Sequence, residues 1–169
     1  MRLSEWRASA TSREATAPKV LETLQRVLAV LGAEPDPPCW VAWGDDPTTR
    51  YVVLVPIPAG LVTVNVRVNI PGEGPRASGK LIRWKRVQVG DLAVETQAGH
   101  ALVSISVEGT ILRGADADAE AVGEFLQVLY AAEDGRPMVD AAPRARRRPG
   151  GEPGAPLVRR PVRRQGAGV

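Results

Sequence analysis

Apolar residues recur at helical spacing in two segments that lie far apart along the chain. In the first, between Pro18 and Leu31, the apolar positions are Val20, Leu21, Leu24, Val27, Leu28 and Leu31. In the second, they are Val122, Phe125, Leu126 and Leu129, after acidic residues of the kind that favour a helix start. A stripe of this width predicts a helix that packs by one face. We therefore expect helices over 18–31 and 116–132.

Between these two segments the hydrophobic period becomes that of a strand. The clearest alternation runs from Leu61 to Ile70, where every second residue is valine or isoleucine. Four further segments have strand character: 39–43, 51–57, 91–96 and 101–107. The links between them are short and rich in glycine, proline or polar residues, which is typical of hairpins. At least five strands with such links predict a mostly antiparallel sheet.

The stretch 76–89 fits either secondary structure. Leu81, Trp84 and Val87 share a helical face, whereas Ile82 with Trp84 suits a strand. We expect a short helix from about Ala77 to Arg86, followed by extended chain. The sequence thus predicts an α+β fold, in which a mostly antiparallel sheet of five or more strands packs against N-terminal and C-terminal amphipathic helices.

Charge divides the chain into two parts of opposite sign. The 169 residues carry a formal net charge of +3. Residues 1–140 are net acidic, by −4, whereas residues 141–169 hold eight arginines against one glutamate, for a net of +7. The second part also holds five prolines and five glycines and no aromatic residue, so it has little apolar surface to offset the entropy of ordering. We expect one α+β domain over 1–140 and a disordered basic tail over 141–169.

The residues that carry enzyme chemistry are scarce. Cys39 and His100 are the only cysteine and histidine, which excludes an intrachain disulfide and the usual zinc sites and leaves one possible Cys–His pair. We interpret Cys39 as a small buried residue of a strand and His100 as part of a turn. Asp45-Asp46 is interpreted as a turn, and the acidic run from Asp116 to Glu120 as a helix start, rather than as metal ligands. We predict no enzyme activity, no metal and no cofactor.

One motif resembles a phosphate-binding loop. Residues Gly74 to Lys80 satisfy G-x-x-x-x-G-K, but Leu81 stands where the serine or threonine that ligates magnesium belongs. The loop also requires alternating strands and helices with a parallel sheet, which the pattern does not supply. We interpret the motif as a flexible link.

Two groups of basic residues are candidates for binding polyanions. Within the predicted domain they surround Trp84, an arrangement that can hold a nucleic-acid backbone or simply form a solvated face: Arg76, Lys80, Arg83, Lys85 and Arg86. In the tail they form clusters that attract phosphate polymers nonspecifically, or that only solubilise the chain: Arg144, Arg146, Arg147, Arg148, Arg159, Arg160, Arg163 and Arg164.

Three tryptophans are candidates for a protein interface: Trp40, Trp43 and Trp84. Because Trp40 and Trp43 are three residues apart on a predicted strand, they point to opposite faces of the sheet. One of them then faces away from the main helix layer. It either contacts a partner or lies under the N-terminal segment, which contains Trp6.

The order of the expected elements resembles a YbjN-type domain, and through it the α+β fold of type III secretion chaperones. Three segments carry the resemblance: LIRWKRVQVGDLAVE (81–95), GHALVSISVEG (99–109) and DADAEAVGEFLQVLYAA (116–132). In that family a short helix leads through a glycine-containing turn to a hairpin and a closing amphipathic helix. The resemblance covers about residues 17–133. It implies a small non-enzymatic domain, often dimeric, that binds other proteins.

These patterns predict a non-catalytic, chaperone-like adaptor that binds another protein or forms a homodimer. The alternative is a protein associated with nucleic acid or ribonucleoprotein, which uses the arginine-rich tail and the 76–86 basic segment. No apolar run reaches the roughly 18 to 20 residues of a membrane span, and the N-terminal residues lack the apolar core of a signal peptide. We therefore expect a cytoplasmic protein without a membrane span.

Overall fold

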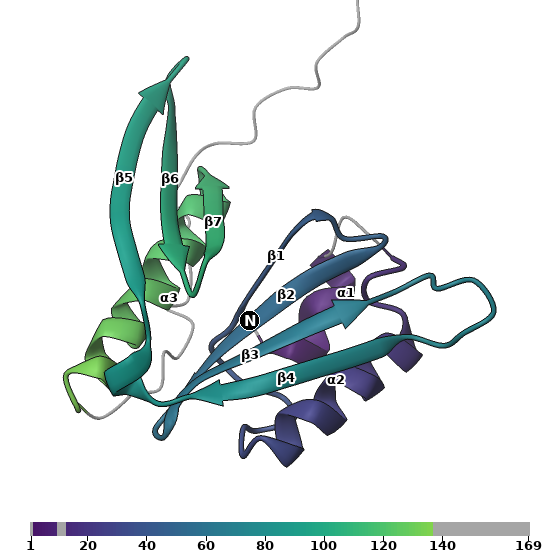
Figure 1. The fold of residues 1–169 in the computed structure, drawn as a ribbon. Helices are drawn as coiled ribbons and strands as arrows, with labels where there is room; N and C mark the ends of the chain where they lie inside the picture. Colours follow the sequence, from purple (N-terminus) through teal and green to yellow (C-terminus); the bar gives the residue numbers. More distant parts are fainter. Residues whose placement is uncertain (1, 10–12, 137–169) are drawn as a thin grey trace, which may run out of the picture.

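The computed structural model describes residues 2–9 and 13–136, which form an α+β structure with two antiparallel sheets (Figure 1). The first sheet has the strand order β1-β2-β3-β4, and the second has the order β5-β6-β7. The strands are β1 (Val41–Asp46), β2 (Arg50–Ile57), β3 (Gly60–Arg67), β4 (Arg76–Ile82), β5 (Val89–Gln97), β6 (His100–Val107) and β7 (Thr110–Ala115). The α-helices are α1 (Trp6–Ser9), α2 (Pro18–Val30) and α3 (Ala117–Glu133), and the 3-10 turns are η1 (Leu3–Glu5) and η2 (Trp84–Arg86).

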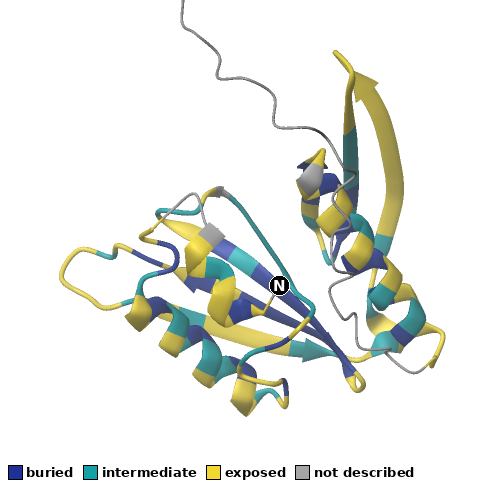
Figure 2. Ribbon diagram, turned by 180° about the vertical axis from the view of Figure 1, so that it is seen from behind, coloured by how far each residue is buried: buried dark blue, intermediate teal, exposed yellow. Residues whose placement is uncertain are grey.

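Helix α2 covers one face of the first sheet, as Figure 2 shows from behind. Its Val20, Leu24 and Leu28 are buried, and they share a core with alternate residues of β2 and β3 such as Val53 and Val64. Pro18 suits the first position of the helix because that position needs no hydrogen-bond donor. We call this buried cluster the first core.

Helix α3 joins the second sheet to the opposite face of the first. Phe125 and Leu129 are buried together with Ile105 of β6 and with Leu54 and Leu61 of the first sheet. We call this cluster the second core. Strands β2 and β3 are therefore buried on both faces, with alternate residues in each core, and this two-sided burial explains the nearly continuous apolar run of β2.

The two helices and five strands expected from periodicity are confirmed, and every strand pair is antiparallel. The single sheet of five or more strands was wrong, because the chain leaves the first sheet after β4 and starts a second one with β5. Strand β7 was not foreseen: its six residues lie between the turn at Gly109 and α3.

The expected helix from Ala77 to Arg86 was also wrong. Residues Arg76–Ile82 form β4, which pairs with β3 along its whole length, and only Trp84–Arg86 form a helical turn. The strand is favoured because its alternate residues Ala77 and Leu81 pack on the first core beneath α2.

No helix within residues 2–9 and 13–136 is long and apolar enough to cross a membrane. The predicted basic tail and its eight arginines lie outside the residues that the structure describes.

Candidate functional site

Strand β5 forms an edge of the second sheet. It has nine residues and pairs with β6 on one side, and no other described strand pairs with it. The hairpin of β5 and β6 projects beyond β7 and α3 in Figure 1. An edge strand presents a row of backbone N–H and C=O groups that can pair with another chain. Within the residues described, β5 is the longest strand with such an edge.

Two apolar side chains of β5 are exposed to solvent. Leu92 is 49% exposed and Val94 is 65% exposed. They pair with Ile105 and Val103 of β6, so they lie on the face of the sheet that meets α3. Ile105 is nevertheless buried, because α3 packs on β7 and β6, whereas the outer strand stays uncovered. The sheet thus continues its apolar face past the edge of its helix.

The backbone at both ends of β5 sets its position. Between Val89 and Leu92 the ladder with β6 has an irregularity, which shifts the register by one residue. At the other end, Ala98 and Gly99 both have positive φ, as a tight two-residue hairpin turn requires. His100 follows this turn, and its Nδ1 lies 2.8 Å from a carboxylate oxygen of Asp116, next to the start of α3. This exposed contact ties the hairpin to the helix.

The basic segment 76–86 is divided by the structure. Arg76 and Lys80 are exposed residues of β4, on the face turned away from α2. Arg83 precedes η2, and Lys85 and Arg86 are exposed residues within it. The five cations are thus not a single helical face, as the expected helix would have made them.

Two further arginines lie beside Arg76 but were missed in the sequence. Arg50 pairs directly with Arg67 across β2 and β3, and Arg67 pairs with Arg76 across β3 and β4. The hairpin turn at 58–59 was predictable, and counting outward from it would have placed residues 50 and 67 opposite each other. What was missing was the strand assignment of 76–82.

The three candidate tryptophans all contact the interior. Trp40 packs on the first core, with its ring 4.9 Å from that of Trp6. Trp43 packs on the second core, so the predicted opposite orientation is confirmed. Trp84 also packs on the second core, and its indole N–H lies 3.1 Å from the carbonyl oxygen of Ile57 and 3.2 Å from that of Pro58. All three are half-buried, and Trp40 lies against the N-terminal segment.

Cys39 and His100 are separated into different environments. Cys39 packs on the second core, and burial, followed by the negative charge of Glu124, raises the pKa of its thiol to about 11. The thiol is therefore protonated at neutral pH, whereas a nucleophilic cysteine needs a lowered pKa. No group of three potential metal ligands occurs among residues 2–9 and 13–136.

The Gly74–Lys80 motif does not form a loop before a helix. Its last five residues belong to β4, and Gly79 lies under α2, where an added Cβ would be 2.8 Å from a methyl carbon of Leu31. The glycine thus permits close packing of helix and strand.

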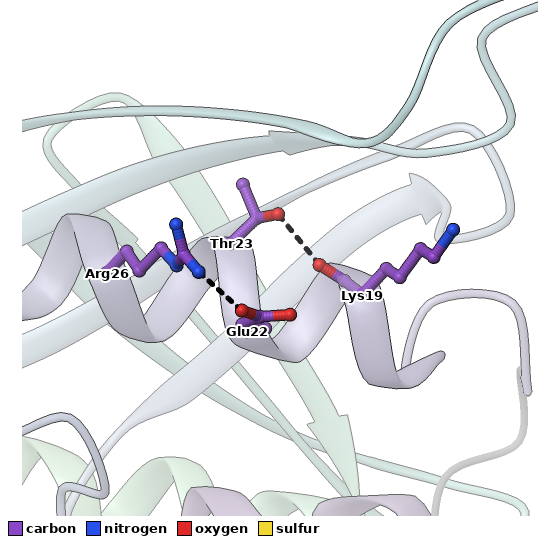
Figure 3. Close-up of polar contacts among 4 residues, drawn as sticks. All are labelled: Lys19, Glu22, Thr23 and Arg26. Atoms are coloured by element: carbon purple, nitrogen blue, oxygen red, sulfur yellow. Dashed lines mark hydrogen bonds and ion pairs between the residues drawn. The ribbon is translucent and has the colours of Figure 1, made fainter.

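An open hollow lies where α2 meets the edge of β4. Thr23, Asn65, Arg67 and Ser78 are among its lining residues. Its helix side offers few free polar groups, because the Thr23 hydroxyl donates to the carbonyl oxygen of Lys19 at 2.7 Å and Arg26 pairs with Glu22 at 2.6 Å (Figure 3). The free cations lie on the sheet side.

No protein-family profile, curated protein or solved structure matches this chain. Its own geometry offers two surfaces that can bind a macromolecule: the edge of β5 and the basic face of the first sheet.

Proposed function

We propose that this chain is a non-catalytic, chaperone-like adaptor that pairs the edge of β5 with an extended segment of another protein. The observation that carries the proposal is the exposure of Leu92 and Val94 on an edge strand of nine residues. In strand addition, backbone hydrogen bonds supply affinity and alternate side chains supply specificity. The proposal agrees with the protein-binding role that the resemblance to YbjN-type domains implies.

The chemistry of β5 defines the segment it takes. Leu92 and Val94 lie on the face of the sheet that meets α3, where a paired segment would place its apolar residues beside them. Glu95 is exposed on the opposite face, where it favours basic or neutral neighbours. A suitable segment therefore alternates apolar residues with polar or basic ones.

The same edge supports a homodimer. A second copy offers its own β5, and antiparallel pairing of the two strands would join the three-stranded sheets into one of six strands. Such a contact is self-complementary, as a two-fold dimer requires. It would also cover Leu92 and Val94 in both copies.

Replacement of Val94 by lysine tests the proposal. Because this side chain is 65% exposed, V94K leaves the fold intact and introduces a charge at the edge. V30K is the matched control, since Val30 is 86% exposed on α2, far from β5 along the chain. Light scattering coupled to size exclusion should show a dimer for the full chain and for V30K, and a monomer for V94K.

Capture from the native extract tests the adaptor role separately. The expected result is a partner that is retained by the wild type and V30K and lost with V94K. A dimer that persists in V94K removes the proposed dimer contact. If no retained partner depends on Val94, the adaptor proposal is wrong.

A further inference from the structure

Three arginines form a row across the first sheet. Arg50, Arg67 and Arg76 are direct partners on β2, β3 and β4. Lys80 lies on the same face of β4, two strand periods further along. In a sheet, directly paired residues have their Cβ atoms roughly 5 Å apart. Four cations from three strands are thus gathered on a small area.

This row lies on the face of the sheet away from α2. The neighbouring residues Tyr51, Val66 and Ala77 point into or against the first core, so the arginines between them point the opposite way. All three arginines are exposed. In Figure 1 no helix or strand lies over these ends of β2, β3 and β4, because α3 covers the sheet near their other ends.

The charges of the row are only partly balanced within the described chain. Arg76 pairs with Glu73 at 2.6 Å, whereas no ion pair is found for Arg50, Arg67 or Lys80 among these residues. Asp46 is the register partner of Arg50 on β1, but its carboxylate accepts hydrogen bonds from the backbone and hydroxyl of Thr48. Like charges placed directly opposite each other destabilise a sheet. A bound anion would relieve this repulsion.

The adjacent row supplies groups of a different kind. Ser78 pairs with Asn65, Asn65 with Val52, and Val52 with Trp43. Asn65 and Ser78 are exposed, and the ring of Trp43 is half-buried at the margin of the second core. Arginine forks and polar side chains bind phosphate oxygens, and an aromatic ring on a sheet can stack a base.

We propose that this face binds the backbone of a single-stranded nucleic acid, with phosphates on the Arg50–Arg67–Arg76 row. The combination of a cation row, hydrogen-bonding side chains and a tryptophan on one exposed sheet face favours this ligand over an acidic protein segment, which has no use for the ring. The site is separate from the β5 edge and does not depend on the proposed adaptor role.

The test compares two variants that each remove two positive charges from the full chain. R50Q/R67Q alters the row, and K85Q/R86Q alters exposed cations of η2 outside it. Binding of fluorescein-labelled oligo(dT) is measured by anisotropy over a range of salt concentrations. Because the basic tail is present in every protein, its contribution is the same in each comparison.

We expect R50Q/R67Q to weaken oligo(dT) binding by about tenfold and to reduce the salt slope by about two, one for each lost phosphate contact. K85Q/R86Q should change the affinity less than about twofold. Equal losses in both variants, or no binding by the wild type, would overturn the proposal. It is equally overturned if poly-glutamate binds the row more tightly than oligo(dT), since the occupant is then an acidic protein.

Discussion

The hydroxyl of Tyr51 donates a hydrogen bond of 2.9 Å to the carbonyl oxygen of Ala15, 36 residues earlier in the chain. Tyr51 begins the buried part of β2, and Ala15 precedes α2, so the bond ties the N-terminal segment to the sheet. The ring of Tyr51 also meets the ring of Trp6 edge-on, with the centroids 5.5 Å apart. Burial raises the pKa of the hydroxyl, so it keeps its proton and remains a donor.

Replacing Tyr51 by phenylalanine should lower the free energy of unfolding by about 1 to 2 kcal/mol, because the ring contacts remain and only the buried hydrogen bond is lost. Urea denaturation followed by tryptophan fluorescence measures this change. Tyr130 supplies the control, since it is 39% exposed on α3. If Y51F and Y130F have the same stability, the bond to Ala15 contributes nothing measurable.

The sequence was sufficient for the elements whose apolar pattern is complete within one segment. Helix α2 is an example: Val20, Leu24 and Leu28 repeat at helical spacing and are all buried. The alternation of β3 likewise separates Val62, Val64 and Val66 from the residues that face the other way. In such segments a single local pattern determines both the element and its buried face.

Strand β4 could not be predicted in this way, because its structure depends on a distant neighbour. Its side chains toward α2 are Ala77, the hydrogen of Gly79, and Leu81, a pattern too weak to show alternation. Pairing with β3 and the close approach of α2 decide the conformation. With β4 unassigned, the sequence could show Arg76 only among its neighbours in the chain and not beside Arg50 and Arg67.

The β5 site also depended on tertiary structure. The sequence predicted the hairpin, but Leu92 and Ile105 look equally suited to a core. Only the placement of α3 over β7 and β6 leaves Leu92 exposed and Ile105 buried. Exposure of one apolar strand beside another is therefore a property of the helix docking, which no local pattern encodes.

The two glycines that begin and end the G-x-x-x-x-G pattern have different roles. A Cβ on Gly79 would lie 2.8 Å from a methyl carbon of Leu31 and 3.0 Å from the carbonyl oxygen of Thr63. Gly74 has no atom within 4 Å of the same position. We expect G79A to lower the free energy of unfolding by about 1 to 3 kcal/mol through overpacking, and G74A to leave it within about 0.5 kcal/mol of the wild type.

Thermal unfolding of both variants measures the difference. Equal melting temperatures would show that α2 shifts away from β4 without cost. If the motif instead bound phosphate, both glycines would be needed for nucleotide binding, and equilibrium dialysis with ATP and magnesium would detect retention by the wild type. We expect none, because Lys80 and Leu81 continue β4 rather than open a helix.

The thiol of Cys39 makes stability depend on alkaline pH. Burial first, and then the negative charge of Glu124, raise its pKa from 9.0 to about 11 in the folded chain. The folded state therefore holds the proton to a higher pH than the unfolded state does. The stability linked to this proton is complete below pH 9 and is lost as the pH rises through 11. At pH 11 the loss should reach about 2 kcal/mol.

Urea denaturation of the wild type and C39A between pH 7 and pH 11 isolates this effect. C39A should be less stable at neutral pH, because it leaves a small cavity, but its stability should fall less between pH 9 and pH 11. Tyr51 also loses its proton at high pH, and this contribution is common to both proteins. E124Q should reduce the fall as well, since it removes the repulsion that helps to raise the pKa of Cys39. Parallel pH profiles for the wild type and C39A would show that the thiolate is tolerated in the second core.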